Sequence, residues 1–231
     1  MNKEIILGKV INPCFPRSGH RLLKNMLMEY FGDELLFHSK MVQRNTFDQS
    51  NYIKNHDNEL LNSLKTGIEI NDSWKYVVQF RHPIMSIVSY FEFHIRTRTH
   101  LNNQQEFLSF LNSRINYWKR FIQKWTLTQP NFILIPYEQL IEDPLTKIGE
   151  VVRFMTESER IDMSKLMRSM EKHRWPLYRY KEDEKAKNIS EPRKLADFKY
   201  YDQGLFEDVE RKLFVDYLKP LEIRPLLMQS T

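Results

Sequence analysis

Three short runs of β-branched and aromatic residues recur along the chain, and each is followed by a longer segment with helical spacing. The runs lie around 8–12, at "KYVVQF" (75–80) and at "NFILIPY" (131–137). Such runs are typical of buried strands. Strands that alternate with helices form parallel sheets that are covered on both faces. The sequence therefore predicts an α/β fold over residues 1–231, a single domain with a central parallel sheet flanked by helices.

The expected helices are marked by apolar residues at three- and four-residue spacing. This spacing is found in the segments 22–30, 84–91, 107–125, 148–155 and 205–217. Pro83 suits the first turn of the second helix, and Asp143 with Pro144 suits the start of the fourth. Residues 172–204 are polar and contain two prolines without a sustained period. This segment is predicted to be a loop or a flap.

The composition favours a globular protein over a membrane-spanning or disulfide-rich one. The chain has 231 residues, of which 41% are hydrophobic, which is enough for a sizeable core. No apolar run reaches the roughly 18 residues of a membrane span, and the early charges at the N-terminus do not suit a secretory signal. Cys14 is the only cysteine, which excludes an intrachain disulfide and zinc sites built from several cysteines. These features favour a reducing, cytoplasmic setting.

The chain is basic, and the excess is uneven. The net charge is +5, and residues 168–200 alone hold ten Lys/Arg against six Asp/Glu, a local charge of +4. Aromatic residues are interspersed in this basic stretch. Such a stretch favours an anionic partner, which can be a nucleic acid, a membrane surface or an anionic small molecule.

The loop "PCFPRSGHRLL" (13–23) connects the first expected strand to the first expected helix. The first N–H groups of a helix lack partners within the helix, and with the helix dipole they attract anions. Ser18 can donate its hydroxyl, Gly19 allows close approach of the backbone, and Arg17 adds a fixed positive charge. The nucleoside-triphosphate pattern G-x-x-x-x-G-K-[ST] is absent, which disfavours a magnesium-dependent triphosphate site. The alternative is an ordinary turn with a surface arginine.

A second stretch, "RHPIMSIVSY" (81–90), follows the second expected strand. Arg81 lies at the strand end, and Ser89 lies about two helical turns further on. Both are expected at the carboxyl edge of the sheet, where ligands of open α/β folds bind. An arginine together with a hydroxyl suits a phosphate monoester. The alternative is that the two residues share no ligand.

Together these stretches resemble the sulfotransferases that use 3′-phosphoadenosine 5′-phosphosulfate (PAPS). The family loop Y-P-K-S-G-T-T corresponds to "FPRSGHR" here, and R-x-P-x-x-x-x-x-S-Y corresponds to "RHPIMSIVSY". "PYEQLIEDP" (136–144) looks like Y-E-D-x-x-x-D-P, and "YIKNHDNEL" (52–60) is similar to I-K-T-H-x-P. Tyrosylprotein sulfotransferases also have P-R-S-G. The C-terminal motif R-K-G-x-x-G-D-W-K is only partly kept, as "RKLADFK" (193–199), without its glycines.

The resemblance implies a P-loop-type domain that moves a sulfuryl group from PAPS to an acceptor hydroxyl without a metal ion, leaving adenosine 3′,5′-bisphosphate (PAP). The implied cofactor-binding residues are Arg17, Ser18, Gly19, His20 and Arg21 at the 5′-phosphate, Arg81 and Ser89 at the 3′-phosphate, Tyr137 beside the adenine, and Arg193 and Lys194 closing over it. Because arginine does not readily release a proton, Arg17 is expected to act electrostatically.

A base must take the proton of the acceptor, and histidine has a suitable pKa. The match of "IKNH" to I-K-T-H makes His56 the preferred catalytic base beside Arg17, and His38 and Glu34 remain alternatives. The acceptor is expected to carry a saccharide, lipid or small-metabolite hydroxyl, and peptide tyrosine stays open because Arg17 does not exclude it; the sequence does not give its identity. No nucleic-acid partner and no stable membrane insertion are expected, and the oligomeric state is open.

Two other functions share these features. A P-loop kinase of small molecules has the same fold class, but it needs a Walker-type loop and acidic magnesium ligands, and neither is evident. A non-catalytic nucleotide- or RNA-binding protein would use the basic, aromatic stretch 168–200.

Overall fold

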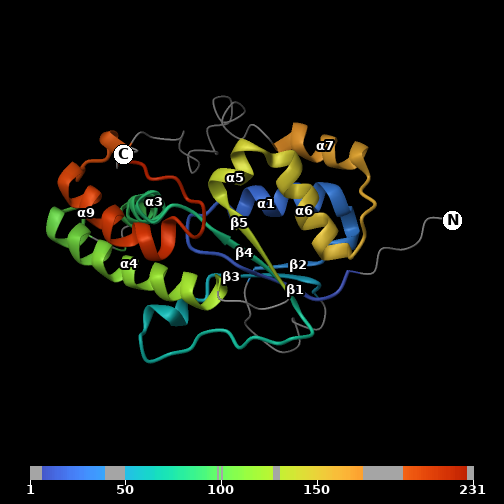
Figure 1. The fold of residues 1–231 in the computed structure, drawn as a ribbon, viewed down its shortest axis with the longest axis horizontal. Coiled ribbons are helices and arrows are strands. Elements are labelled where there is room, and N and C mark those ends of the chain that lie inside the picture. The colour runs from blue at the N-terminus through green and yellow to red at the C-terminus, as the bar shows by residue number, and fades with distance from the viewer. Residues whose placement is uncertain are drawn as a thin grey trace.

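The fold is a parallel sheet between two layers of helices. The computed structural model describes residues 7–39, 50–97, 99, 101–126, 131–173 and 195–227. Within this part, five strands pair in the order β2-β3-β1-β4-β5, all parallel (Figure 1). The strands are β1 (Val10–Pro13), β2 (Phe37–His38), β3 (Tyr52–Asn55), β4 (Lys75–Phe80) and β5 (Phe132–Pro136). The predicted fold class is confirmed, and β2 and β3 are strands that the sequence pattern did not predict.

The five predicted helices follow in the predicted order, and the helices over Tyr137–Glu142 and Met163–His173 were not predicted. The helices are α1 (His20–Phe31), α3 (Pro83–Arg96), α4 (Gln104–Thr126), α5 (Tyr137–Glu142), α6 (Pro144–Thr156), α7 (Met163–His173) and α9 (Gln203–Leu213). Short 3₁₀ turns lie at η1 (Gly32–Glu34), η2 (Asn58–Leu61) and η4 (Leu195–Asp197), and a π-helical stretch, η5 (Phe214–Leu218), continues α9. Asp143 caps α6 as expected, because its side chain accepts a hydrogen bond from the Thr146 amide at 3.1 Å.

Two predictions need correction. The third strand ends at Pro136, and Tyr137 begins α5 instead of completing the strand. The loop predicted for 172–204 is wrong at both ends, because α7 extends to His173 and α9 begins at Gln203. The part between 174 and 194 lies outside the described residues.

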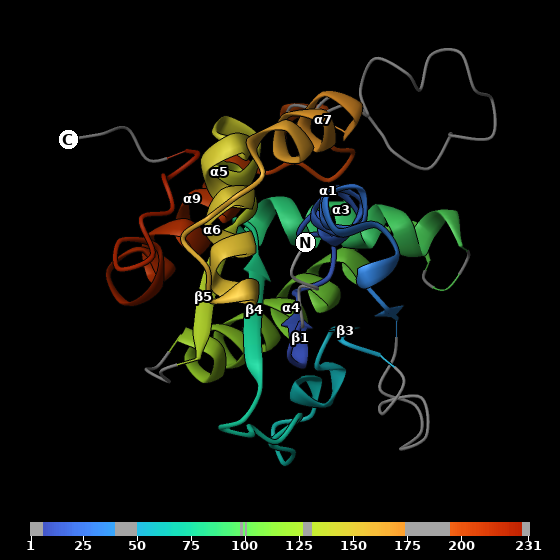
Figure 2. The ribbon, with the colours of Figure 1, turned by 90° about the vertical axis from the view of Figure 1, so that its right-hand side faces the viewer.

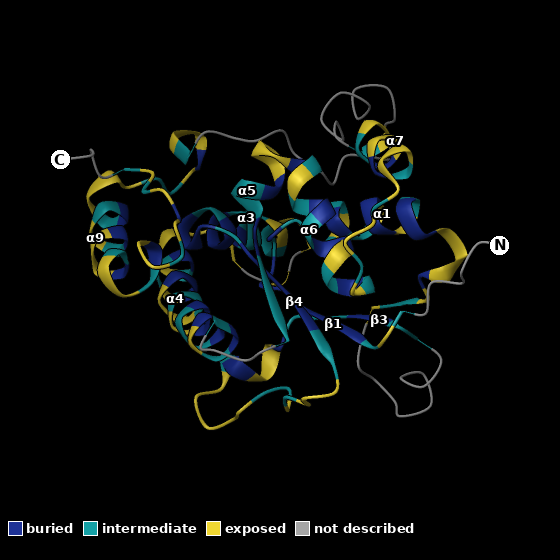
Figure 3. Ribbon diagram, turned by 45° about the vertical axis from the view of Figure 1, so that its right-hand side comes forward, coloured by how far each residue is buried: buried dark blue, intermediate teal, exposed yellow. Residues whose placement is uncertain are grey.

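The side chains of alternate strand residues pack into two separate hydrophobic cores, one on each face of the sheet. Ile11, Ile53 and Val78 face the core beneath α3, α4 and α9. Val10 and Val77 face the core beneath α1, α6 and α7. A sheet buried on both faces must be apolar at successive positions, which explains the continuous β-branched runs of the sequence. Figures 1 and 2 show the two groups of helices on opposite sides of the sheet, and Figure 3 shows their inward faces buried.

A buried carboxylate fixes the chain that leaves β3. Asp57 accepts hydrogen bonds from Trp125 Nε1 at 2.9 Å, from Lys124 Nζ at 2.9 Å and from the Ile68 amide at 2.8 Å. A buried charge is tolerated where it is paired and hydrogen-bonded in this way. The Tyr117 hydroxyl of the same helix donates to the backbone carbonyl of His56. Helix α4 therefore determines where the segment after β3 lies.

The strand ends place the motifs on one edge. Residues 14–19 follow β1, His56 follows β3, Arg81 follows β4 and Tyr137 follows β5. In a parallel sheet these carboxyl ends meet at the same edge, which is where ligands of open α/β folds bind. Among the described helices, none combines the length and the apolar character needed to cross a bilayer.

Candidate functional site

The β1–α1 loop is held in a conformation that requires its glycine. Arg17 and Gly19 have φ angles of 66° and 80°, in the left-handed region. A Cβ atom on Gly19 would lie 2.3 Å from Cδ2 of Tyr137, so the tyrosine ring packs directly on the loop. The Ser18 hydroxyl is buried and donates to the Phe15 carbonyl at 2.6 Å. Ser18 therefore fixes the loop from inside, whereas the sequence led us to expect its hydroxyl on the anion.

Arg17 joins the first motif to the second. Its Nε donates a hydrogen bond to Ser89 Oγ at 3.1 Å, between residues 72 positions apart in the sequence. The guanidinium carbon also lies 5.4 Å from the centroid of the Phe93 ring, one helical turn beyond Ser89 on α3. The loop after β1 and the helix after β4 therefore meet at one point.

Arg81 and Tyr137 complete this meeting point. The Arg81 guanidinium carbon lies 4.7 Å from the centroid of the Tyr137 ring, a cation–π distance. Its Nε is 3.9 Å from Oε1 of Glu138, is buried and has no hydrogen-bond partner. The Tyr137 ring is thus in contact with both Gly19 and Arg81, so three of the motifs identified in the sequence converge.

The charge at the site is strongly positive. Burial lowers the pKa of Arg17, and the nearby cations Arg96, Arg21 and Arg81 lower it further. Glu92 partly opposes this effect. Four arginines whose charges repel one another favour the binding of a multiply charged anion, which relieves the repulsion.

His56 lies beside the loop with both ring nitrogens engaged. Nδ1 is 2.7 Å from the Cys14 carbonyl, and Nε2 is 2.7 Å from Lys54 Nζ. A carbonyl can only accept, so we assign the proton to Nδ1, and Nε2 then accepts from the ammonium group of Lys54. Burial and, next, the charge of Lys54 lower the pKa of His56 to about 4. The imidazole is therefore neutral near pH 7.

His20, at the start of α1, packs edge-on against His56 with ring centroids 5.5 Å apart. Burial and the charge of Lys54 lower its pKa to about 3. One ring nitrogen of each histidine and the Cys14 thiol lie within 4.8 Å of one another, a donor set of the kind that holds soft metal ions. Burial raises the thiol pKa to about 12, and Lys54 occupies His56 Nε2. Both features oppose a bound cation.

The structure places the two alternative bases, Glu34 and His38, apart from this centre, and the charge of Arg21 acts on Arg17 and His20. Glu34 is exposed in η1. His38 ends β2, the edge strand, and β3 lies between it and β1. Arg21 is exposed on the first turn of α1. Arg193 and Lys194 lie outside the described residues.

Three charged residues of the site were missed by the sequence analysis. Lys54 lies inside the quoted stretch "YIKNHDNEL", two residues before the histidine that it contacts. Glu92 and Arg96 follow Ser89 by three and seven residues, which places them on the same face of α3. That helical spacing was the signal that could have identified them.

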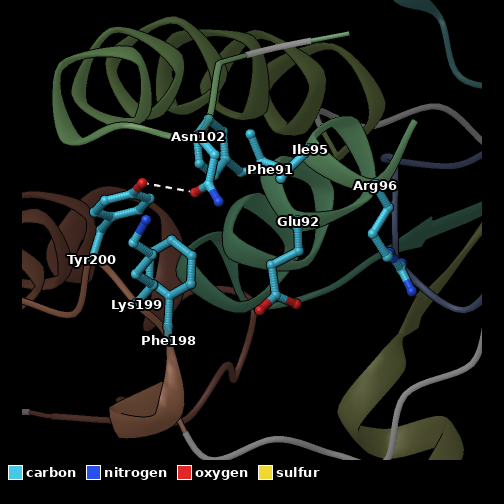
Figure 4. A pocket seen from close by; sticks show the side chains of 8 residues that line it. All are labelled: Phe91, Glu92, Ile95, Arg96, Asn102, Phe198, Lys199 and Tyr200. Carbon is cyan, nitrogen blue, oxygen red and sulfur yellow. Dashed lines mark hydrogen bonds between the residues drawn. The ribbon is translucent and has the colours of Figure 1, made fainter. Parts of the chain in front are cut away.

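A pocket of about 230 Å³ opens beside the same face of α3 (Figure 4). Glu92 and Arg96 line it on one side, and Phe198 and Tyr200 line it on the other. The Tyr200 hydroxyl donates to Asn102 Oδ1 at 2.7 Å, which holds the 198–200 segment in place. The last residues of the C-terminal motif are therefore anchored next to Glu92 and Arg96, whose charges act on Arg17.

Comparisons with known proteins agree with this fold. The chain resembles the structure of mouse sulfotransferase SULT7A1 complexed with PAP, with a TM-score of 0.58 and 16% identity over 90% of this chain and 84% of that one. It also resembles the sulfotransferase domain from the Curacin biosynthetic pathway, with a TM-score of 0.51 and 13% identity over 96% and 100% of the two chains. No curated protein sequence matches. The family of the sulfotransferase domain matches residues 14–219. By this match over most of its length, the chain belongs to the sulfotransferase family.

Proposed function

We propose that the protein transfers a sulfuryl group from PAPS to an acceptor hydroxyl. The observation that carries this proposal is the hydrogen bond from Arg17 Nε to Ser89 Oγ at 3.1 Å, because it makes one continuous site of two anion-binding motifs. Membership of the sulfotransferase family supports it, as does the similarity to a mouse sulfotransferase solved with PAP. A ligand with two phosphates matches a site that joins two sets of donors.

The donor would span the site from Arg17 to Arg81. The 3′-phosphate monoester of the donor carries roughly 1.5 to 2 negative charges at pH 7, and the 5′-phosphosulfate adds further negative charge, which suits the mutual repulsion of the site arginines. In this proposal Arg17 and the amides of Gly19, His20 and Arg21 hold the 5′-phosphate. Arg81 and Ser89 hold the 3′-phosphate, Tyr137 lies beside the adenine, and Arg193 and Lys194 close over it.

The reaction would be an in-line transfer. The acceptor oxygen forms a bond to sulfur while the bond from sulfur to the bridging phosphate oxygen breaks, and the acceptor proton passes to a base. The transition state resembles that of phosphoryl transfer, so positioning and charge supply most of the stabilisation. Arg17 supplies positive charge at the bridging oxygen. Because a guanidinium stays protonated, it stabilises the leaving group without donating a proton.

His56 would be the base, and the structure indicates what must change for it to act. Its Nε2 lone pair faces the Lys54 ammonium at 2.7 Å. When an anionic donor binds, Lys54 can turn to the donor and release Nε2 for the acceptor proton. The added negative charge also raises the His56 pKa from about 4 toward neutrality, where a general base is most effective.

A comparison of ligands tests the donor. At 100 times its Kd, PAP should stabilise the fold by about 2.7 kcal/mol, which is a rise in melting temperature of roughly 5–10 °C for a chain of this size. AMP should give a much smaller rise at the same concentration, because it lacks the 3′-phosphate. Arg17→Met should remove most of the PAP effect, and Arg211→Met, on the exposed side of α9, should leave it unchanged.

The outcomes separate the alternatives. A rise with ATP and magnesium that equals or exceeds the rise with PAP would overturn the proposal in favour of a kinase. Affinity that grows with oligonucleotide length and falls steeply with salt would favour RNA binding. If PAP binds as expected, incubation with ³⁵S-labelled PAPS and panels of saccharide, lipid and small-metabolite hydroxyls identifies the acceptor.

A further inference from the structure

His82 lies between Arg81 and the first residue of α3, and its side chain points into the protein. Its Nε2 is 3.0 Å from Oε1 of Glu210, and both side chains have no exposed surface. The distance is short, but neither ring nitrogen of His82 has a hydrogen-bond partner, so the contact is a close polar pair rather than a hydrogen bond. A polar pair that is wholly buried is costly unless further partners satisfy it.

Glu210 has those partners. It lies on α9, and its two carboxylate oxygens accept hydrogen bonds from the amides of Leu226 at 2.6 Å and Leu227 at 2.9 Å. The carboxylate therefore connects three parts of the chain: the turn that carries Arg81, helix α9, and the segment that follows η5. The two amides already give each carboxylate oxygen a hydrogen bond, so the contact with His82 is additional to what burial of the glutamate requires.

The backbone of the Arg81–His82 turn is held from two further helices. Trp118 Nε1 of α4 donates to the Arg81 carbonyl at 3.2 Å. The His82 amide donates to Glu138 Oε1 of α5 at 3.0 Å. The Arg81 side chain itself has weaker support, since its Nε has no hydrogen-bond partner and lies 3.9 Å from Glu138 Oε1, and its guanidinium rests on a ring face. Its direction therefore depends on how firmly the turn beneath it is held.

We propose that Glu210, acting through His82, is a positioning residue that aims Arg81 at the 3′-phosphate of the donor. The inference rests on the proposed function, which places the 3′-phosphate at Arg81. Glu210 fixes the side-chain end of the His82 residue, and Glu138 fixes its amide. Loss of the Glu210 anchor would let the turn shift, and small misplacements of a binding group have large effects on what it can hold.

The test compares two ligands that differ only in the 3′-phosphate. In Glu210→Gln, an amide replaces one acceptor oxygen by a donor, so at least one of the three contacts is lost. We expect the Kd for PAP, measured by calorimetry, to rise by about 5- to 20-fold, while the Kd for AMP changes by less than about twofold. A loss that is confined to PAP is not produced by general destabilisation, which weakens both ligands.

Variants of His82 test the same link without changing Glu210. His82→Leu keeps the Glu210 carboxylate with its two backbone donors but removes the link, and it should show the same selective loss of PAP affinity. His82→Gln can still donate to the carboxylate and should recover most of the wild-type preference. Equal losses for PAP and AMP, or an unchanged ratio of the two Kd values in folded variants, would overturn the inference. A wild-type protein with no preference for PAP over AMP would instead refute the proposed function, and this inference with it.

Discussion

An arginine in place of lysine at position 17 changes what the anion loop can do. Its Nε donates to Ser89 at 3.1 Å, and the two terminal nitrogens of the guanidinium can still bond other oxygens. A lysine would have to divide a single ammonium group between the serine and the ligand. The fork geometry of arginine thus permits one side chain to connect the motifs and to hold an anion at the same time.

His56→Ala tests the catalytic base at this scale. A general base contributes about 10²- to 10⁴-fold to a rate, so single-turnover transfer from labelled PAPS should slow by that factor. The Kd for PAP should change by less than about threefold, because the ring of His56 is hydrogen-bonded to Lys54 and the Cys14 carbonyl and makes no hydrogen bond to the site arginines. The measurement is a quench-flow time course with an acceptor from the panel.

The two alternative bases provide the comparison. His38→Ala and Glu34→Gln should keep near-normal rates, because β3 separates His38 from β1 and Glu34 is exposed in η1. A His56 variant that transfers at the wild-type rate, or a His38 variant that does not transfer, would show that the base has been assigned to the wrong residue.

At the scale of elements, the strands predicted from the sequence are those in which burial on both faces produces a nearly uninterrupted run of β-branched and aromatic residues. Apart from Lys75 and Gln79, the runs at β4 and β5 are apolar or aromatic, because both faces of the sheet are covered. β3 reads "YIKN", and its last two residues are polar because they face the site edge. β2 is two residues long and too short for any period to show. These two strands form through pairing with their neighbours, which local patterns do not encode.

The same distinction holds for the site. Arg17, Arg81 and Ser89 lie in motifs whose local spacing made them visible, Tyr137 was identified through the family resemblance, and the structure brings the four together. Glu210 gave no local signal, because its contact with His82 joins α9 to a turn far away in the sequence. Polar contacts between distant elements depend on the tertiary fold, so they could not be predicted from the sequence pattern.

Gly19→Ala tests the packing of the β1–α1 turn on Tyr137. A side chain at a φ of 80° is strained by about 1–3 kcal/mol, and the new Cβ would lie 2.3 Å from the tyrosine ring. We expect a lower free energy of unfolding and at least tenfold weaker PAP binding, because the turn that presents the amides must move. Urea unfolding and calorimetry measure the two effects.

Two further variants separate strain from clash. In a Tyr137→Ala background the same Gly19 substitution should cost less, since only the backbone strain remains. Gly204→Ala is the matched control: it lies in the first turn of α9, and its nearest neighbour to a new Cβ is 3.6 Å away. It should be neutral or slightly stabilising. Equal costs of Gly19→Ala in both backgrounds would mean that the ring does not pack on the turn.

At the scale of the whole molecule, positive charge is concentrated at the carboxyl edge of the sheet, whereas the net charge of the whole chain is small. The chain carries a net charge of only +5, yet the charges of Arg21, Arg81 and Arg96 all act on Arg17. Such focusing accelerates the approach of anionic ligands and makes their binding sensitive to salt. It also affects the neutral groups that share the edge, because a nearby cation disfavours a further positive charge on them.

The stability of the whole fold should therefore depend on the protonation of two histidines. In the folded protein the pKa values are about 4 for His56 and about 3 for His20, below the roughly 6.5 of an unfolded chain. Between pH 6.5 and 4 the unfolded state binds more protons, so the free energy of unfolding should fall as the pH falls through this window. Above pH 7 neither histidine contributes to a slope.

Urea unfolding at pH 7.5, 6.0 and 5.0 measures this loss of stability. The single variant His56→Gln separates the contribution of that residue from that of carboxylates that titrate in the same pH range. The variant should lose less stability than the wild type between pH 6.0 and 5.0. Saturating PAP should also reduce the wild-type slope, because the added negative charge raises both histidine pKa values in the folded state. Parallel slopes for wild type and variant would mean that His56 is not the buried, neutral group that its contacts with Cys14 and Lys54 imply.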